Sequence, residues 1–256
     1  MLIETLSVFP EMFDTVMSTS ILGRARRAGL FEFRAHDLRD WTHDRHRTVD
    51  DEPYGGGQGM LMKVEPIFEA VEAISASGSR PRTVFFTPCG DRFDQACAER
   101  LAGCERLLLV CGRYEGMDER AYDLADERLS IGDYVLTGGE LPAMVVADAV
   151  VRLIPGALGD EMSPVDESFS TRPSGGLLEY AQYTRPASFR GREVPPVLLS
   201  GDHARVDAWR RADAIERTCR WRPDLIDGAG LTPEERDRAR ELVARYHGPD
   251  ARPARE

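Results

Sequence analysis

Two short runs of apolar residues, each ending at a glycine turn, constrain the fold of this 256-residue chain more than any other feature. Residues 83–87 (Thr-Val-Phe-Phe-Thr) end at Pro88-Cys89-Gly90, and residues 107–111 (Leu-Leu-Leu-Val-Cys) end at Gly112. Continuous apolar strands are typical of parallel sheets that are buried on both faces. Helical periodicity at 64–76 and 91–101 separates these strands from other segments. The sequence therefore predicts an α/β fold with a parallel sheet covered on both faces.

The rest of the chain predicts a second, helical part. Further strands are expected at 2–8 and 30–35, and further helices at 11–28, 140–154, 202–220 and 233–246. Residues 159–176 hold Asp, Glu, Ser, Thr, Pro and Gly without periodicity, as a flexible linker does. The predicted domains are thus 1–158, which contains the sheet, and 177–256, which is all-helical.

Composition limits the function classes. The formal net charge of −11 argues against bulk electrostatic attraction to nucleic acid, although the acidic excess lies before residue 177. Five cysteines without a C-x-x-C pair favour reduced thiols in a cytoplasmic protein. No apolar run reaches the ~18 residues of a membrane span, and the N-terminus has no secretory signal, so no membrane association is expected.

The stretch from Ser130 to Pro142 (SIGDYVLTGGELP) interleaves apolar residues with three glycines, just before a helical pattern. It is the third glycine-rich exit, after those at 87–90 and 111–116, and carboxyl ends of parallel strands meet at one sheet edge. We therefore expect one pocket, in which backbone groups hold a ligand and Tyr134, Leu136 and Pro142 form apolar walls. No dinucleotide or Walker motif is present. The alternative is a tight strand-to-helix connection without a ligand.

Three further features carry charge. Residues 42–60 form a charged, glycine-rich loop, in which Arg45 and Arg47 favour contact with a polyanion; the His43/His46 spacing is only a weak sign of metal binding. Arg152 interrupts an apolar helix turn, where a cation needs an anionic partner or a developing oxyanion. The adjacent carboxylates Asp166 and Glu167 lie in the linker, and composition alone predicts that they are solvated.

Together these segments resemble the bacterial tRNA (guanine-N1)-methyltransferases, the TrmD family. The matching runs keep the family's order: Phe9–Phe13, Thr42–Met62, Leu107–Arg120, Ile131–Met144, Ile154–Gly156, Tyr183–Pro186 and Val194–Gly201. The resemblance implies a SPOUT fold, in which the parallel sheet ends in a deep trefoil knot and a small all-helical domain follows. Such a knot is one of the rare exceptions to unknotted chains.

The resemblance also implies the site. S-adenosylmethionine (AdoMet) would be bound by Pro88, Cys89, Gly112, Tyr114, Glu115, Ile131, Gly132, Asp133, Tyr134, Val135, Leu136, Gly138, Gly139 and Pro142. The reaction would be methyl transfer to N1 of the guanine that follows the anticodon, at tRNA position 37. N1 carries a proton that a base must remove, and a cation can stabilise charge at O6. Arg152 matches the family's essential arginine.

The general base is where this sequence departs from the family pattern. The family has an Asp just before Ser-Phe; here the aligned residue is Glu167, and an Asp stands one position earlier, at Asp166. Either carboxylate remains a candidate, and Glu167 is favoured by alignment. Cys89 stands where the family usually has Gln, which leaves its backbone contacts in place but not a side-chain contact.

The resemblance finally implies partners. Members are homodimers in which the linker carboxylate of one subunit completes the pocket of the other, and Mg²⁺ is expected, with Glu115 as a contact. The substrate would be the anticodon branch of a tRNA with guanines at positions 36 and 37. Two alternatives are a ribose 2′-O-methyltransferase on the same fold, which needs no N1 base, and a non-catalytic protein that binds AdoMet and tRNA.

Overall fold

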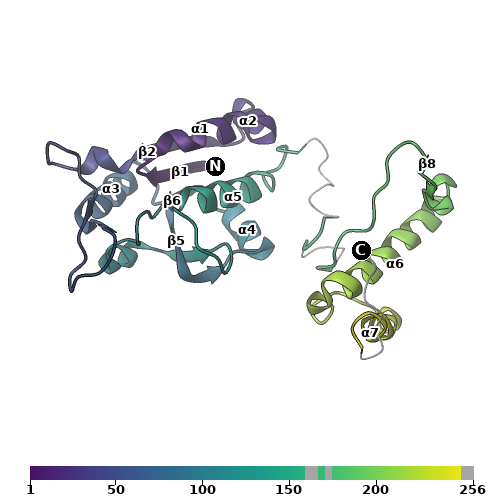
Figure 1. The fold of residues 1–256 in the computed structure, drawn as a ribbon. Helices are drawn as coiled ribbons and strands as arrows, with labels where there is room; N and C mark the ends of the chain where they lie inside the picture. The colour runs from purple at the N-terminus through teal and green to yellow at the C-terminus, as the bar shows by residue number, and fades with distance from the viewer. Residues whose placement is uncertain (159–166, 171–174, 249–256) are drawn as a thin grey trace. The chain divides into compact units, whose positions relative to one another are not determined.

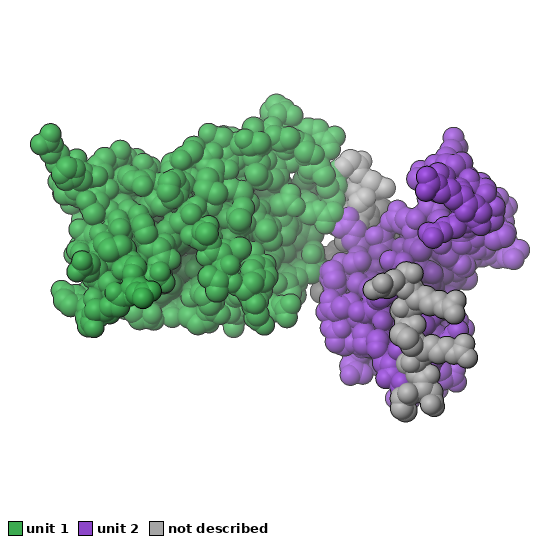
Figure 2. All heavy atoms as spheres, viewed as in Figure 1, with its two compact units in different colours: residues 1–161 green, residues 162–256 purple. Residues whose placement is uncertain are grey.

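A computed structural model of the chain describes residues 1–158, 167–170 and 175–248. Two compact units, Met1–Glu161 and Met162–Glu256, each have their own hydrophobic core; Figure 2 colours them separately. Asp166 and most of the predicted linker lie outside the described residues. Among the helices that the structure describes, none is long and apolar enough to cross a membrane.

The first unit is built on one five-stranded sheet, in the order β2-β1-β6-β5-β7, with every pair parallel (Figure 1). Its strands are β1 (Leu2–Ser7), β2 (Glu32–Asp37), β5 (Arg82–Arg92), β6 (Arg106–Val110) and β7 (Glu127–Ser130). The predicted α/β fold with a parallel sheet is therefore confirmed. The edge strand β7 was not predicted, because its sequence Glu-Arg-Leu-Ser is mostly polar.

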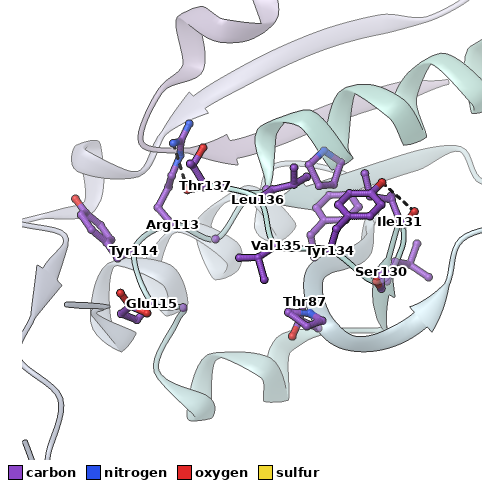
Figure 3. A pocket seen from close by; sticks show the side chains of 18 of the residues that line it. Thr87, Arg113, Tyr114, Glu115, Ser130, Ile131, Tyr134, Val135, Leu136 and Thr137 are labelled. Carbon is purple, nitrogen blue, oxygen red and sulfur yellow. Dashed lines mark hydrogen bonds between the residues drawn. The ribbon is translucent and has the colours of Figure 1, made fainter. Parts of the chain in front are cut away.

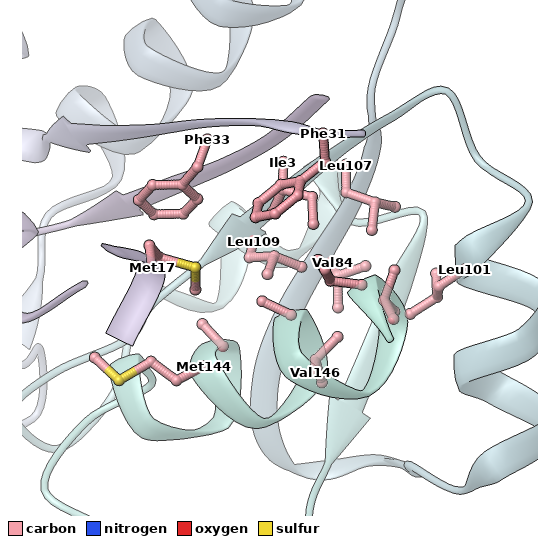
Figure 4. Packing of buried hydrophobic residues seen from close by; sticks show 14 of the residues in the cluster. Ile3, Met17, Phe31, Phe33, Val84, Leu101, Leu107, Leu109, Met144 and Val146 are labelled. Atoms are coloured by element: carbon pink, nitrogen blue, oxygen red, sulfur yellow. The ribbon is translucent and has the colours of Figure 1, made fainter. Parts of the chain in front are cut away.

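Helices cover both faces of the sheet, as the apolar strands require. On one face lie α1 (Asp14–Ser18), α2 (Ser20–Arg27), α4 (Gln95–Ala102) and α5 (Glu140–Val151), and on the other lies α3 (Val64–Ala76). Two 3₁₀ helices, Leu38–Trp41 and Glu119–Leu124, complete the second layer. In β6, Leu107 and Leu109 pack in the first core and Leu108 and Val110 in the second. Figure 4 shows the first core.

The helix predicted at 11–28 is wrong in one respect, because the chain breaks at Thr19. A 3₁₀ turn (Pro10–Phe13) and α1 precede Thr19, which is extended (φ −108°, ψ 155°), and α2 follows it. The bend brings the Ser18 carbonyl so close to Gly23 that a Cβ there would lie 2.1 Å from the oxygen. Gly23 thus permits a break that apolar periodicity does not reveal.

Residues 42–60, predicted as a loop, contain strand β3 (Asp50–Asp51), which forms a short antiparallel hairpin with β4 (Leu61–Met62). The chain between these strands turns through glycines with positive φ, among them Gly55, Gly56 and Gly57. Tyr54 at its tip is fully exposed. The hairpin fixes the base of this loop and leaves the tip in solvent.

The second unit packs α6 (His203–Trp221) against α7 (Pro233–His247) around a small core that includes Leu177, Ile215 and Leu242. The capping box at Thr232 and Glu235 is present. Two short 3₁₀ helices (Pro196–Leu199, Pro223–Leu225) and a hairpin of β8 (Ser188–Phe189) and β9 (Arg192–Glu193) also occur, so the part predicted as all-helical contains strands.

The segment that carries Glu167 belongs to this second unit. The Phe169 N–H donates to the Leu177 carbonyl (3.2 Å), and the Gly230 N–H donates to the Gly175 carbonyl (3.1 Å). Ser168 Oγ accepts the Glu179 N–H at 2.9 Å. These bonds attach residues 167–170 and 175–176 to the loop segments around Leu177 and Gly230 in the second unit.

Candidate active site

A cavity of about 210 Å³ lies beside residues 86–88 of β5 and the segments that follow β6 and β7. Strand β5 does not end at the predicted exit 87–90 but continues to Arg92, with irregular pairing to β7 between Phe86 and Asp91. The walls of the cavity are the three glycine-rich exits, which come from neighbouring strands of the sheet (Figure 3). The sheet order thus brings together residues as far apart in the sequence as Phe86 and Pro142. The prediction that the three glycine-rich exits line one pocket is confirmed.

Twelve of the fourteen residues predicted to bind AdoMet line this cavity: Pro88, Gly112, Tyr114, Glu115, Ile131, Gly132, Tyr134, Val135, Leu136, Gly138, Gly139 and Pro142. Cys89 and Asp133 are not among the lining residues. The Cys89 thiol is exposed and lies 3.2 Å from the Thr87 hydroxyl. Eight further lining residues were not among those predicted to bind AdoMet: Phe86, Thr87, Arg113, Gly116, Tyr122, Leu129, Ser130 and Thr137. All but Tyr122 are next to or within the predicted exits.

Two of the exits touch through their backbones. The Gly139 N–H donates to the Gly112 carbonyl at 2.8 Å, and Arg113 and Gly138 form an isolated antiparallel bridge. A Cβ on Gly139 would lie 2.8 Å from the Cys111 Cα and 2.9 Å from the Gly112 nitrogen, closer than real Cβ contacts. Only glycine fits this junction, and the junction keeps the two walls of the cavity at a fixed distance from each other.

The third wall turns on Gly132, whose φ of 150° is strained for other residues. The Tyr134 hydroxyl donates to the Ile131 carbonyl at 3.2 Å, so its ring folds back over Gly132. Figure 3 shows this contact beside Val135 and Leu136. Val135 is 91% exposed, which places an apolar side chain in solvent at the cavity mouth.

The hairpin segment reaches the rim of the cavity. The Glu115 N–H donates to the Met60 carbonyl at 3.0 Å, and the Met62 N–H donates to the Gly116 carbonyl at 2.9 Å. Burial raises the pKa of the Tyr114 phenol, and the nearby Asp50 carboxylate raises it further. Tyr114 is therefore neutral at physiological pH and can donate a hydrogen bond.

Cysteine nucleophiles do not explain the site. Burial raises the pKa of the Cys111 thiol well above its usual range, and Cys111 lies directly beneath the Gly139 junction. Burial also raises the pKa of Cys97 and of Cys104. These thiols stay protonated and unreactive near neutral pH.

Within the part of the chain that the structure describes, no group of three or more His, Cys, Asp or Glu side chains is arranged to hold a metal ion. His43 Nε2 lies 2.8 Å from a Glu69 carboxylate oxygen instead of beside His46 as a ligand pair. The Glu115 carboxylate packs over Gly59 at the rim. Glu115 by itself would supply one ligand to a metal ion.

The predicted catalytic residues belong to different units. Arg152 follows the last residue of α5 in the first unit and is half-buried, as the apolar turn around it suggested. Glu167 is half-buried in the second unit, where its carbonyl accepts the Ser170 N–H at 3.2 Å. Asp166 is outside the described residues.

A parallel α/β sheet with a glycine-lined cavity at its carboxyl edge defines a class of small-ligand-binding proteins. The family model described as "tRNA (Guanine-1)-methyltransferase TrmD" matches residues 1–228. The chain therefore belongs to the tRNA (guanine-1)-methyltransferase family. The sequence resemblance to this family is confirmed.

Curated relatives agree over nearly their full length, and each bears the name tRNA (guanine-N(1)-)-methyltransferase. The relative from Heliobacterium modesticaldum is 55% identical over 90% of this chain and 86% of its own. The relative from Geobacter sulfurreducens is 53% identical over 91% and 94%, and that from Moorella thermoacetica 51% over 97% and 98%.

Proposed function

We propose that this chain is an AdoMet-dependent tRNA (guanine-N1)-methyltransferase that methylates the guanine at tRNA position 37. The observation that carries the proposal is the family match over residues 1–228, which includes every residue of the cavity. Relatives of the same name at 50–55% identity support an enzyme of this type and not either alternative.

The cavity suits the methyl donor. AdoMet supplies an electrophilic methyl carbon on a sulfonium sulfur, flanked by an amino acid and a nucleoside. Backbone groups at Gly112 and Ile131 offer hydrogen bonds for polar edges, and Tyr134, Leu136 and Pro142 supply apolar surface. The close contact of the exits at Gly139 is also where we propose that the chain forms the trefoil knot.

Two side chains would then act on the guanine. A linker carboxylate, Glu167 or Asp166, accepts the N1 proton, and the freed electron pair on N1 forms the bond to the methyl carbon. As the carbon–sulfur bond breaks, its electron pair stays on sulfur. Arg152 stabilises the negative charge that develops at O6. The candidate bases and the Arg152 cation belong to different units of the chain.

Mg²⁺ with Glu115 as a contact remains a prediction. Mg²⁺ prefers several oxygen ligands, and among the described residues that line the cavity only Glu115 carries a carboxylate. A resident metal held by protein ligands alone does not fit this arrangement.

We also propose a homodimer, built on an exposed apolar face of the first unit. Leu141 and Val145 lie one turn apart on α5 and are 50% and 47% exposed, and Val135 projects nearby in the sequence. Phe9 and Met12 are also exposed and contact Arg113 from the start of the chain. Apolar surface of this kind usually marks an association site.

We propose that the second unit binds the anticodon branch of the tRNA. The Arg220 guanidinium stacks 4.6 Å from the Trp221 ring centroid and 5.6 Å from that of Tyr246. Trp221 is 56% exposed. Arginine stacked on an exposed aromatic ring supplies both charge and a stacking surface for RNA.

The test is methylation of unmodified tRNA that carries guanines at positions 36 and 37, with labelled AdoMet. The expected product after nucleoside digestion is 1-methylguanosine; a 2′-O-methylated nucleoside would establish the ribose alternative, and binding without turnover the non-catalytic one. Single-turnover rates of Glu167→Ala and Asp166→Ala then identify the base. Near-normal turnover by Glu167→Ala would assign the role to Asp166.

A further inference from the structure

Behind the cavity wall lies a buried ion pair between Arg113 and Glu140. Glu140 is the first residue of α5 and is 1% exposed. Its Oε2 lies 2.9 Å from Arg113 Nε, and its Oε1 accepts a hydrogen bond of 2.6 Å from the Ser7 hydroxyl at the end of β1. The carboxylate therefore joins three segments that are distant in the sequence.

Burial of this carboxylate is costly, and the fold only partly offsets the cost. The amino end of α5, the Arg113 guanidinium and the Ser7 hydroxyl all lie against this carboxylate. Yet Arg113 Nε and Glu140 Oε2, although 2.9 Å apart, have no aligned hydrogen-bond partner among the described residues. Unaligned buried polar atoms reduce stability, so stability alone does not explain this pair.

The pair lies at the junction of two cavity walls. Arg113 Nη1 donates to the Thr137 carbonyl at 3.4 Å, and Figure 3 shows Arg113 pointing toward Thr137 and away from Thr87. A Cβ on Gly138 would lie 2.4 Å from Arg113 Nε and 2.5 Å from Glu140 Oε2. The missing side chain at Gly138 leaves the space that the ion pair occupies.

The other side of the Arg113 guanidinium is also held. Its central carbon lies 4.6 Å from the centroid of the Phe9 ring, and Nη2 lies 3.1 Å from the Met12 sulfur. Arg113 is therefore fixed from both sides. Because Arg113 is held in this way, a shift of Glu140 would also move Arg113 and the β6 exit that carries it. The neighbours of Arg113 in this exit, Gly112 and Tyr114, line the cavity.

We propose that Arg113 and Glu140 are a positioning pair, which holds the β6 exit and the 131–139 wall at the spacing that AdoMet requires. The proposal rests on the proposed function of the cavity. Its consequence is specific: the charge of the pair sets the affinity for AdoMet, whereas the reacting groups that act on guanine are untouched.

The decisive variant is Glu140→Gln, which keeps the volume and the Ser7 hydrogen bond but removes the charge. We expect the Kd and the KM for AdoMet to rise about tenfold, equivalent to about 1.4 kcal/mol, with kcat at saturating AdoMet within about twofold. Calorimetric titration with AdoMet and steady-state methylation measure both. An unchanged Kd, or a fall in kcat without a rise in KM, overturns the proposal.

The matched control is Ser7→Ala, which removes the other hydrogen bond to the same carboxylate. A purely structural role for Glu140 predicts that Ser7→Ala weakens AdoMet binding in proportion to its loss of thermal stability. The positioning role predicts a lower unfolding midpoint and a Kd within about twofold of wild type. A tenfold weaker Kd in Ser7→Ala therefore contradicts the proposal.

Variants of Arg113, the other residue of the pair, complete the test. They remain informative if the Glu140→Gln variant does not fold. Arg113→Lys keeps the charge and should bind AdoMet within about threefold of wild type, whereas Arg113→Gln should lose about tenfold. The double variant with Glu140→Gln should bind no more weakly than Arg113→Gln; additive losses would show that the residues act separately. Failure of the wild type to bind AdoMet would instead refute the proposed function.

Discussion

The junction at Gly139 gives the sharpest prediction for the cavity. Gly139 has an ordinary backbone conformation (φ −82°, ψ −5°), so Gly139→Ala adds no backbone strain, only a methyl group. That methyl would lie 2.8 Å from the Cys111 Cα, about 0.6 Å inside normal contact, and 2.9 Å from the Gly112 nitrogen. Because both neighbours are backbone atoms of a buried strand end, the 131–139 wall must move instead.

Overpacking of this kind costs about 1–3 kcal/mol. Since the same movement stretches the 2.8 Å hydrogen bond from Gly139 to Gly112, we expect the loss to appear in ligand affinity. A cost of 1–3 kcal/mol corresponds to an AdoMet Kd about 5- to 150-fold higher. Calorimetric titration measures the Kd, and circular dichroism checks that the variant remains folded.

Gly103→Ala is the control, because Gly103 ends α4 with a similar conformation (φ −78°, ψ −6°). A Cβ there would meet its nearest atom, the Arg100 carbonyl oxygen, at 3.4 Å, an ordinary contact. We expect Gly103→Ala to leave the Kd unchanged and to alter stability by less than about 1 kcal/mol. If Gly139→Ala binds AdoMet as tightly as Gly103→Ala does, the argument from the junction is refuted.

Three further predictions concern the acceptor side, the sheet and the second unit. Arg152→Ala should lower single-turnover methylation about 10²- to 10³-fold with an unchanged AdoMet Kd, and a normal rate would remove Arg152 from the mechanism. Burial alone raises the pKa of Glu4, but hydrogen bonds from His36 and Arg106 outweigh it and hold this pKa below the ordinary 4.5. The stabilisation by Glu4 is therefore complete above about pH 4.5 and is lost as the pH falls through the lowered pKa. In urea unfolding, Glu4→Gln should cost about 3 kcal/mol at pH 7 and progressively less in acid, and an equal cost at pH 3 would contradict this. Gly175→Ala should destabilise the second unit by more than Gly176→Ala, because both have positive φ but only the Gly175 methyl meets a backbone atom, the Gly230 nitrogen at 2.7 Å; equal thermal shifts would disprove the steric part.

The apolar pattern of the sequence predicted those strands and helices whose formation depends on burial. Residues 83–86 of β5 and 107–110 of β6 are buried, so these segments are almost entirely apolar and the sequence identifies them, although β5 continues to Arg92. The helix predicted at 64–76 is α3 with the same bounds, because its amphipathic face packs on the sheet. The glycine exits were recognisable because close backbone contact excludes side chains.

The apolar pattern did not predict features that depend on contacts between residues distant in the sequence. Strand β7 lies at the sheet edge, and its Glu127 carboxylate is held by Arg82 at 2.7 Å and by Arg100 at 2.5 Å, which periodicity does not record. Tyr122 reaches the cavity only because the 3₁₀ helix that carries it packs beside β5. The spacing of Arg113 and Glu140 likewise gave no sign that they meet.

Five of the twenty residues that line the cavity are glycines, and this composition has a consequence for inhibition. A competitive inhibitor that bonds to the backbone at Gly112, Gly138 and Gly139 depends on few side chains. Substitutions that would repel it add atoms where a Cβ meets neighbours at 2.4–3.3 Å, and so damage the site itself. Resistance by mutation should therefore arise mainly at exposed rim positions such as Val135, whose side chain can change without disturbing the walls.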